Sequence, residues 1–381
     1  MTALALFSGG CDSLIAMKLL TLQGINVKAV HFNIGFGGNK DKSEYLRKAA
    51  AQVGAELVLV DIRKQFFDNV LFTPKYGYGK YFNPCIDCHA NMFAQAFLRL
   101  EEFGASFVVS GEVLGQRPKS QRKEALDQVR KLVRDLGNDP RFSHLLDSSP
   151  MDSSSLDSSS PESKPRFLDE LLLRPMSAKL LEPSFPERVG WVDREKLLDV
   201  SGRGRSRQLE MVKSWGWEHY ENPGGGCLLT DLSVAQKLKD LSAHRKMVLE
   251  DIELVKVGRY MILPGGARLI IGRNEQENAK LSTPNPRMLQ ITLLDSIGPV
   301  SVVESNASEA DKLLAAQCTL AYAKPHEQRQ SLADSSPEST QANLGAPDIA
   351  PKAQRVKVGD EILHVTPIQK ERAHEFLFFK A

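Results

Sequence analysis

The chain has 381 residues, of which 42% are hydrophobic and 25% are charged, and its formal net charge is +2. These values are those of a folded globular protein with room for two or three domains, and they exclude a protein that binds nucleic acid through overall charge alone. No apolar run reaches the ~20 residues of a membrane span, no basic signal-peptide stretch opens the chain, and five cysteines do not suit a disulfide framework. We therefore expect a cytoplasmic protein with reduced thiols and no membrane partner.

The first predicted elements are an apolar strand at residues 4–7 and an amphipathic helix at residues 13–23, joined by a glycine pair. Glycines allow close backbone approach, and a helix start offers free N–H groups, so the junction suits a bound anion. Asp12 would repel phosphate but suits Mg²⁺. The alternative is a simple strand-to-helix turn capped by Asp12 or Ser13. The residues predicted to bind phosphate are Ser8, Gly9, Gly10, Asp12 and Ser13.

The next elements alternate between apolar strands (27–32, 56–61, 106–110) and helices (43–53, 63–71, 85–103). This alternation predicts a doubly wound parallel sheet, in which ligands bind beyond the carboxyl ends of the strands. His31, Gly111 and Arg117 lie near such ends, so we expect them at an ATP site. A partly buried structural role is the alternative for His31, and an ordinary charged surface loop is the alternative for Arg117.

Three cysteines stand in places that suit chemistry. Cys85 and Cys88 follow Pro84 at a predicted helix start, where the positive helix end favours thiolates, and Cys227 follows three glycines. Three interpretations of these cysteines compete: they are persulfide or redox nucleophiles, they are metal ligands, or they are inert core thiols. Three thiolates suit a [4Fe–4S] cluster with one open iron better than a disulfide exchange, which needs two, while Zn²⁺ with His89 as a fourth ligand is a further alternative.

Basic residues outnumber acidic ones in a predicted helix at 121–136 and its approach, and again within a helical stretch at 192–217 that is broken at 202–205. Such segments are either solvated helix faces or contacts to a phosphate backbone. On the second interpretation the RNA-binding residues are Lys119, Arg122, Arg203 and Arg205.

The pattern Ser-Gly-Gly-x-Asp-Ser at residues 8–13 resembles the pyrophosphate-binding loop of the PP-loop ATPases, which adenylate a substrate and release pyrophosphate. Together with segments 83–93, 110–118 and 223–231, it makes residues 1–245 similar to the tRNA-thiolating branch of that family, which includes 4-thiouridine synthetases and 2-thiouridylases. Residues from about 250 onward are similar to the RNA-binding module of NFACT proteins, through segments 257–259 and 271–278.

The resemblance implies an α/β PP-loop ATP-pyrophosphatase domain at 1–185, a helical connector at 186–245 that carries Cys227, and a small α+β RNA-binding module at 250–381. Composition alone predicts a disordered serine-rich insertion at 147–163 in the first domain and a polar linker at 334–351 in the last.

The implied function is that of an ATP-dependent tRNA sulfurtransferase, which adenylates a tRNA base and inserts sulfur. Its cofactors would be ATP, Mg²⁺ on Asp12 and a [4Fe–4S] cluster, and its partners tRNA and a sulfur donor, either sulfide or a cysteine desulfurase persulfide. Asp12 and the three cysteines (Cys85, Cys88, Cys227) would be catalytic. Two alternatives remain: a PP-loop enzyme that thiolates or amidates a small molecule, and a non-catalytic nucleotide- and RNA-binding protein.

Overall fold

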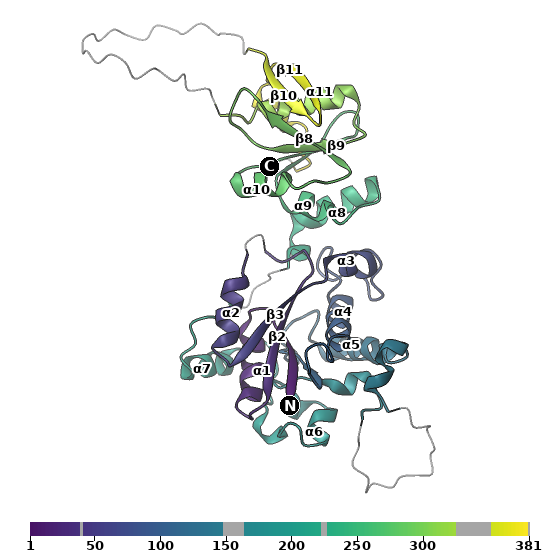
Figure 1. Ribbon diagram of the computed structural model, residues 1–381, viewed down its shortest axis with the longest axis vertical. Helices are drawn as coiled ribbons and strands as arrows, with labels where there is room; N and C mark the ends of the chain where they lie inside the picture. The colour runs from purple at the N-terminus through teal and green to yellow at the C-terminus, as the bar shows by residue number, and fades with distance from the viewer. Residues whose placement is uncertain (39–40, 148–163, 222–226, 325–351, 380–381) are drawn as a thin grey trace, which may run out of the picture. The chain divides into compact units, whose positions relative to one another are not determined.

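A computed structural model describes residues 1–38, 41–147, 164–221, 227–324 and 352–379 (Figure 1). The chain forms two compact units, Met1–Ala235 and Gln236–Ala381. The expected serine-rich insertion, apart from Asp147, and the expected linker at 334–351 lie outside the described residues. The finer division into a domain at 1–185 and a connector at 186–245 stays a prediction.

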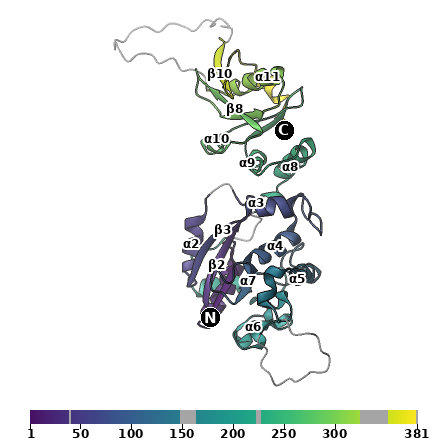
Figure 2. The same ribbon diagram turned by 45° about the vertical axis from the view of Figure 1, so that its right-hand side comes forward.

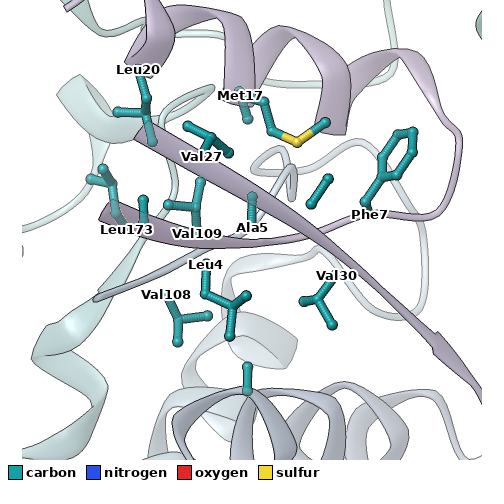
Figure 3. Close-up of a cluster of buried hydrophobic side chains, with 14 of the residues drawn as sticks. Leu4, Ala5, Phe7, Met17, Leu20, Val27, Val30, Val108, Val109 and Leu173 are labelled. Carbon is teal, nitrogen blue, oxygen red and sulfur yellow. The ribbon is translucent and has the colours of Figure 1, made fainter. Parts of the chain in front are cut away.

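The first unit is built on a five-stranded parallel sheet with the strand order β3-β2-β1-β4-β5. Its central strand pairs with β2 on one side and β4 on the other, so that Leu4 lies opposite both Lys28 and Val108. Figure 3 shows Leu4 and Val108 on one face of the sheet and Ala5 and Val109 on the other. The strands are β1 (Thr2–Leu6), β2 (Asn26–Asn33), β3 (Ala55–Asp61), β4 (Phe107–Val109) and β5 (Leu172–Leu173).

Helices cover both faces of this sheet, as the views in Figures 1 and 2 show. Strands buried on both faces read as continuous apolar runs, which is why their hydrophobicity does not alternate. The prediction of a doubly wound parallel α/β fold is confirmed. The helices are α1 (Cys11–Thr21), α2 (Ser43–Ala51), α3 (Arg63–Phe66) with a π-helical turn (Phe67–Leu71), α4 (Cys85–Phe97), α5 (Lys123–Leu136), α6 (Phe185–Arg188) and α7 (Ser206–Ser214).

The predicted helical stretch at 192–217 is the main difference. Only α7 and a short 3-10 turn (Arg194–Lys196) are helical there. Between them the backbone bonds to an earlier segment instead: the Leu198 N–H donates to the Pro175 carbonyl and the Val200 N–H to the Met176 carbonyl. Pairing between distant segments has overridden local helix propensity.

The second unit contains a six-stranded antiparallel sheet with the order β11-β10-β8-β9-β7-β6. Its core includes Ile271, Val303 and Cys318, all fully buried. The strands are β6 (Arg259–Ile262), β7 (Arg268–Ile271), β8 (Met288–Leu293), β9 (Ser301–Glu304), β10 (Gln354–Val358) and β11 (Glu361–Val365). The helices are α8 (Leu232–His244), which begins in the first unit, α9 (Asp251–Lys256), α10 (Glu275–Leu281), α11 (Glu309–Leu320) and α12 (Lys370–His374).

Membrane-spanning helices were not expected, and within the described ranges no helix has the length and apolarity to cross a bilayer.

Candidate active site at the carboxyl edge of the parallel sheet

The glycine loop between β1 and α1 has the geometry of an anion cradle. Gly9 has a φ of +87°, in the left-handed region that favours glycine, and Gly10 caps α1. The Ser13 hydroxyl donates to the Gly10 carbonyl at 2.8 Å, which fixes the first turn of the helix, while Ser8 is exposed. Free N–H groups of the helix start therefore face the edge of the sheet where a phosphate would sit.

Gly111 follows β4 and lies directly against this loop. A Cβ atom at Gly111 would stand 2.5 Å from the Cα atom and 2.6 Å from the N atom of Ser13. The approach exists because β1 and β4 are adjacent parallel strands, whose carboxyl ends meet at one edge. Gly111 therefore determines the position of the loop backbone, whether or not it contacts ATP.

We expect Gly111→Ala to lower ATP-dependent pyrophosphate release by about 100-fold, because displacing a binding loop by about an ångström has effects of that size. The matched control is Gly37→Ala: no atom lies within 4 Å of the added methyl group, and Gly37 has no left-handed φ. Steady-state kinetics of the two variants measure the effect. A Gly111→Ala enzyme as active as the Gly37→Ala control would show that the loop does not depend on this contact.

One carboxylate oxygen of Asp12 accepts hydrogen bonds, and the other accepts none from the described residues. Its Oδ2 atom accepts hydrogen bonds from Gln116 Nε2 at 2.6 Å and from Arg205 Nη2 at 3.0 Å. Its Oδ1 atom is buried and has no hydrogen-bond partner among the described residues. A buried, orphaned carboxylate oxygen is costly unless a ligand completes it, and Mg²⁺ prefers such oxygens.

Arg205 was predicted to contact RNA, but its guanidinium lies on Asp12, and its side chain is 17% exposed. Gln116, its neighbour on the carboxylate, is itself held by the side-chain amide of Gln208 at 2.9 Å. The start of α7 thus braces the phosphate loop. The other predicted RNA contacts, Lys119, Arg122 and Arg203, are exposed.

His31 braces the strand that leads into the loop. Its Nδ1 atom lies 2.9 Å from the Phe7 carbonyl oxygen, and burial lowers the pKa of its imidazole. The ring is therefore neutral near pH 7 and donates from Nδ1. This contact joins β2 to the end of β1, and supports the structural alternative for His31. Arg117 is exposed, and its charge acts on Cys85.

Cys85 and Cys88 lie in the first turn of α4, and Cys227 reaches them from a distant segment. The Phe82 N–H donates to the Leu229 carbonyl at 3.2 Å, which ties the Cys227 segment to the approach to α4. The Leu228 N–H donates to the Phe36 carbonyl at 2.9 Å, beyond the end of β2. The structure therefore brings the three cysteines together at the carboxyl edge of the sheet.

The three thiols differ from the thiolates expected at a helix start. Burial raises the pKa of Cys88 well above its usual value, and the neighbouring Cys227 and Cys85 thiols raise it further. Burial also raises the pKa of Cys85, and that of Cys227 to about 11. Burial raises the thiol pKa values by more than the positive end of the helix lowers them. The thiols are therefore neutral at pH 7 unless a metal cation replaces their protons.

A metal centre at the three cysteines stays a prediction. Within the described ranges, no group of three or more Cys, His, Asp or Glu side chains is arranged to hold a metal ion. His89, the alternative zinc ligand, has its Nδ1 atom 2.7 Å from Glu112 Oε1.

A cluster of Glu112, His89 and Arg174, which the sequence analysis did not predict, joins the cysteine helix to the segment after β4. Glu112 is 5% exposed and bonds His89 through Oε1 and the Arg174 Nε atom, at 2.8 Å, through Oε2. Burial opposes its ionisation, but the charge of Arg174 and the hydrogen bond from His89 outweigh burial and lower the pKa of Glu112 to about 2. The only sequence signal is a charged residue directly after an apolar strand.

This cluster predicts a pH dependence of stability. The pKa of Glu112 falls from 4.5 to about 2 on folding. The contribution of its ionised carboxylate to the free energy of unfolding is therefore complete above pH 4.5 and is lost as the pH falls toward 2. We expect Glu112→Gln to lower the free energy of unfolding at pH 7 by about 3–5 kcal/mol, since Arg174 is left buried without a charge partner.

Urea unfolding at pH 7 and pH 3 measures this, with Glu195→Gln, a surface partner of Lys179, as the matched control. The difference in the free energy of unfolding between wild type and Glu112→Gln should be smaller at pH 3 than at pH 7. The free energy of unfolding of Glu195→Gln should remain near that of wild type at both pH values. A difference for Glu112→Gln that is the same at both pH values would contradict an ionised Glu112 in this cluster.

Comparisons with known proteins give separate family matches in the two compact units of the chain. Residues 1–136 match the family described as tRNA methyl transferase HUP domain, and residues 258–346 match the family described as NFACT protein RNA binding domain. A tRNA-specific 2-thiouridylase MnmA 2 of Clostridium botulinum is 30% identical over 125 residues, which are 30% of this chain and 35% of that protein. A tRNA-specific 2-thiouridylase MnmA of Desulfosudis oleivorans is 35% identical over 109 residues, 28% of this chain and 30% of that protein.

Two solved structures are also similar. A 4-thiouridine synthetase–RNA complex with bound ATP has a TM-score of 0.37 and 18% identity, covering 67% of this chain and 52% of that one. The C-terminal part of a fibronectin/fibrinogen-binding protein from Streptococcus suis has a TM-score of 0.23 and 14% identity, covering 46% and 79%. The family matches confirm the resemblance to a PP-loop tRNA-thiolation enzyme with an NFACT-like module. The chain spans about a third of the length of the 2-thiouridylases it matches.

Proposed function

We propose that the protein is an ATP-dependent tRNA sulfurtransferase. The observation that carries the proposal is the convergence, at one edge of one sheet, of a phosphate loop and three thiols that act on each other's ionisation. A phosphate loop alone supports many ATP-dependent reactions. The added thiols favour sulfur transfer over amidation, and the match to 2-thiouridylases favours tRNA as the substrate.

In the proposed reaction, a carbonyl oxygen of a tRNA base attacks the α-phosphorus of ATP, and pyrophosphate leaves. The loop N–H groups would stabilise the charge that builds up on the departing pyrophosphate. Asp12 would hold a Mg²⁺ ion, which supplies further charge neutralisation when bound. A sulfur nucleophile then adds to the activated carbon, and AMP leaves with the former carbonyl oxygen.

Cys85, Cys88 and Cys227 would hold a [4Fe–4S] cluster, which supplies an open iron for a sulfide when bound. The residues of the chain have a separate task, which is to hold the segment of Cys227 near the approach to the cysteine helix. Cys88 is buried, and the hydrogen bonds of Phe82 and Leu228 hold the Cys227 segment against the cysteine helix. The sulfur donor would be sulfide or the persulfide of a cysteine desulfurase.

The RNA would be held by both units. In the first, exposed Lys119, Arg122 and Arg203 are proposed phosphate contacts, and Arg205 is reassigned to the phosphate loop. In the second, the match to an NFACT RNA-binding family supports contact with RNA. A cytoplasmic location, where tRNA is modified, is part of the same proposal.

Mass spectrometry of tRNA nucleosides from cells that lack the gene tests the proposal. One thionucleoside should be missing, and it should return when the wild-type gene is restored but not when a Cys88→Ala gene is. Anaerobic reconstitution followed by iron and sulfide assay tests the cluster separately. An unchanged set of thionucleosides would contradict tRNA thiolation, and purified protein without iron after reconstitution would favour a persulfide on the same cysteines.

A further inference from the structure

A cluster of basic side chains surrounds one tyrosine ring in the second unit. The chain end brings it together: the Ile262 N–H donates to the Phe376 carbonyl and the Phe378 N–H to the Tyr260 carbonyl, both at 3.0 Å, so the segment after α12 lies along β6. Arg259 opens β6, and Tyr322 follows the end of α11. We call the cluster the Tyr322 patch; it consists of Arg259, Tyr322, Lys370, Arg372 and His374.

The ring of Tyr322 organises the positive charges of the patch. The guanidinium carbon of Arg259 lies 4.4 Å from the ring centroid and the Lys370 ammonium 5.5 Å from it. The imidazole of His374 is stacked on the ring at 6.0 Å with an interplanar angle of 28°. Lys370 and His374 are four residues apart on α12, which places both on the same face of the helix. The charge of Arg372 reaches Cys318 on α11, next to the patch.

These cations have no acidic partners, unlike most others in this unit. Arg245, Arg268, Arg273 and Arg355 are all paired with carboxylates. Within the described ranges, no carboxylate forms an ion pair with Arg259, Lys370, Arg372 or His374. Glu371 and Glu375 neighbour them in sequence, but these side chains are exposed and also make no ion pair there. The Tyr322 ring offsets part of the repulsion between Arg259 and Lys370, and an anionic partner would offset more of it.

We propose that the Tyr322 patch binds RNA, by clamping its phosphate backbone while the flat His374 and Arg259 groups stack with unpaired bases. Lys370, Arg372 and His374 are exposed, whereas Arg259 is half-buried over the ring and its Nη1 atom donates to the Gly272 carbonyl at 3.1 Å. A guanidinium and an imidazole held on an aromatic ring are suited to a ligand that offers both phosphates and π-faces. A single-stranded segment or a loop of the RNA fits this chemistry better than a regular duplex does.

RNA is favoured over an anionic membrane or an acidic protein for two reasons on this surface. Anionic lipid headgroups offer no flat π-face on which these groups could stack, and the family match at 258–346 includes both Arg259 and Tyr322. The inference rests on the proposed function, because it names the part of the second unit that holds the tRNA. It assigns residues that neither the sequence pattern nor the family descriptions identify.

The test is the binding of fluorescently labelled tRNA to the full chain between about 50 and 200 mM salt, the range in which phosphate contacts are lost. Arg259→Gln/Lys370→Gln should weaken binding by about tenfold or more and reduce the slope of log K against log salt by about two. The matched control is Arg355→Gln/Lys357→Gln, which removes the same charge from β10, near the other edge of the sheet. The control should bind tRNA like wild type.

If the double variant unfolds, as judged by its thermal melt, Arg372→Gln replaces it, since this exposed side chain makes no ion pair within the described ranges; it should lower the salt slope by about one. Equal tRNA affinity of the patch and control variants would overturn the inference. The inference would also be overturned if the patch variant lost binding to anionic phosphatidylserine vesicles but bound tRNA as wild type does. A wild-type chain that binds no tRNA would instead contradict the proposed function, which pyrophosphate release tests independently.

Discussion

Asp12→Asn should lower the rate of ATP-dependent pyrophosphate release on the order of 100-fold, the size typical of losing one well-placed electrostatic group. The substitution keeps the shape of the side chain but removes its charge. The buried Oδ1 atom, which has no partner among the described residues, is then a poor Mg²⁺ ligand. Binding of tRNA should remain at the wild-type level, since Asp12 lies in the phosphate loop.

The measurement is pyrophosphate release as a function of Mg²⁺ concentration. The concentration for half-maximal rate should rise in Asp12→Asn, whereas Asp199→Asn, which removes a surface partner of Arg207, should behave like wild type. Wild-type rates in Asp12→Asn at limiting Mg²⁺ would show that the carboxylate does not hold the metal.

A double variant separates the loss of the proposed Mg²⁺ ligand from the loss of the ion pair between Asp12 and Arg205. Removing the carboxylate also leaves the half-buried Arg205 guanidinium without its ion pair, which costs stability on its own. Adding Arg205→Gln to Asp12→Asn should restore the thermal stability but not the rate. Recovery of both would mean that the unpaired arginine, and not the lost Mg²⁺ ligand, caused the defect.

The parts of the site that the sequence predicted are those that local chemistry determines. The loop at 8–13 needs a strand, two glycines and a helix start, all of which are adjacent in the chain. The parallel sheet follows from alternating apolar strands and helices. Both depend on periodicity and turn chemistry, which a single sequence displays.

The parts that the sequence did not predict depend on partners far along the chain. Arg205 bonds Asp12 across 193 positions, and Arg174 bonds Glu112 across 62. Arginines in a basic stretch are ordinarily solvated, so nothing local distinguishes Arg205 from the exposed Arg203. The thiol ionisation was missed for a related reason: a helix start lowers a thiol pKa, but the burial that raises it comes from the three-dimensional packing.

The cysteines allow adenylation and sulfur transfer to be separated. We expect Cys85→Ala, Cys88→Ala and Cys227→Ala each to reduce tRNA thiolation by at least about 100-fold, because two remaining sulfurs do not complete a three-thiolate centre. Pyrophosphate release should persist, since none of the three belongs to the glycine loop. Iron bound after anaerobic reconstitution should fall in all three variants by the same proportion.

Cys318→Ala is the matched control, since it removes a buried thiol from the core of the second unit. It should cost some stability but leave thiolation and bound iron unchanged. The pattern among the three site variants then decides the chemistry. Equal losses on all three indicate a shared centre, whereas thiolation that survives Cys227→Ala but not Cys85→Ala or Cys88→Ala would indicate a persulfide passed between two cysteines.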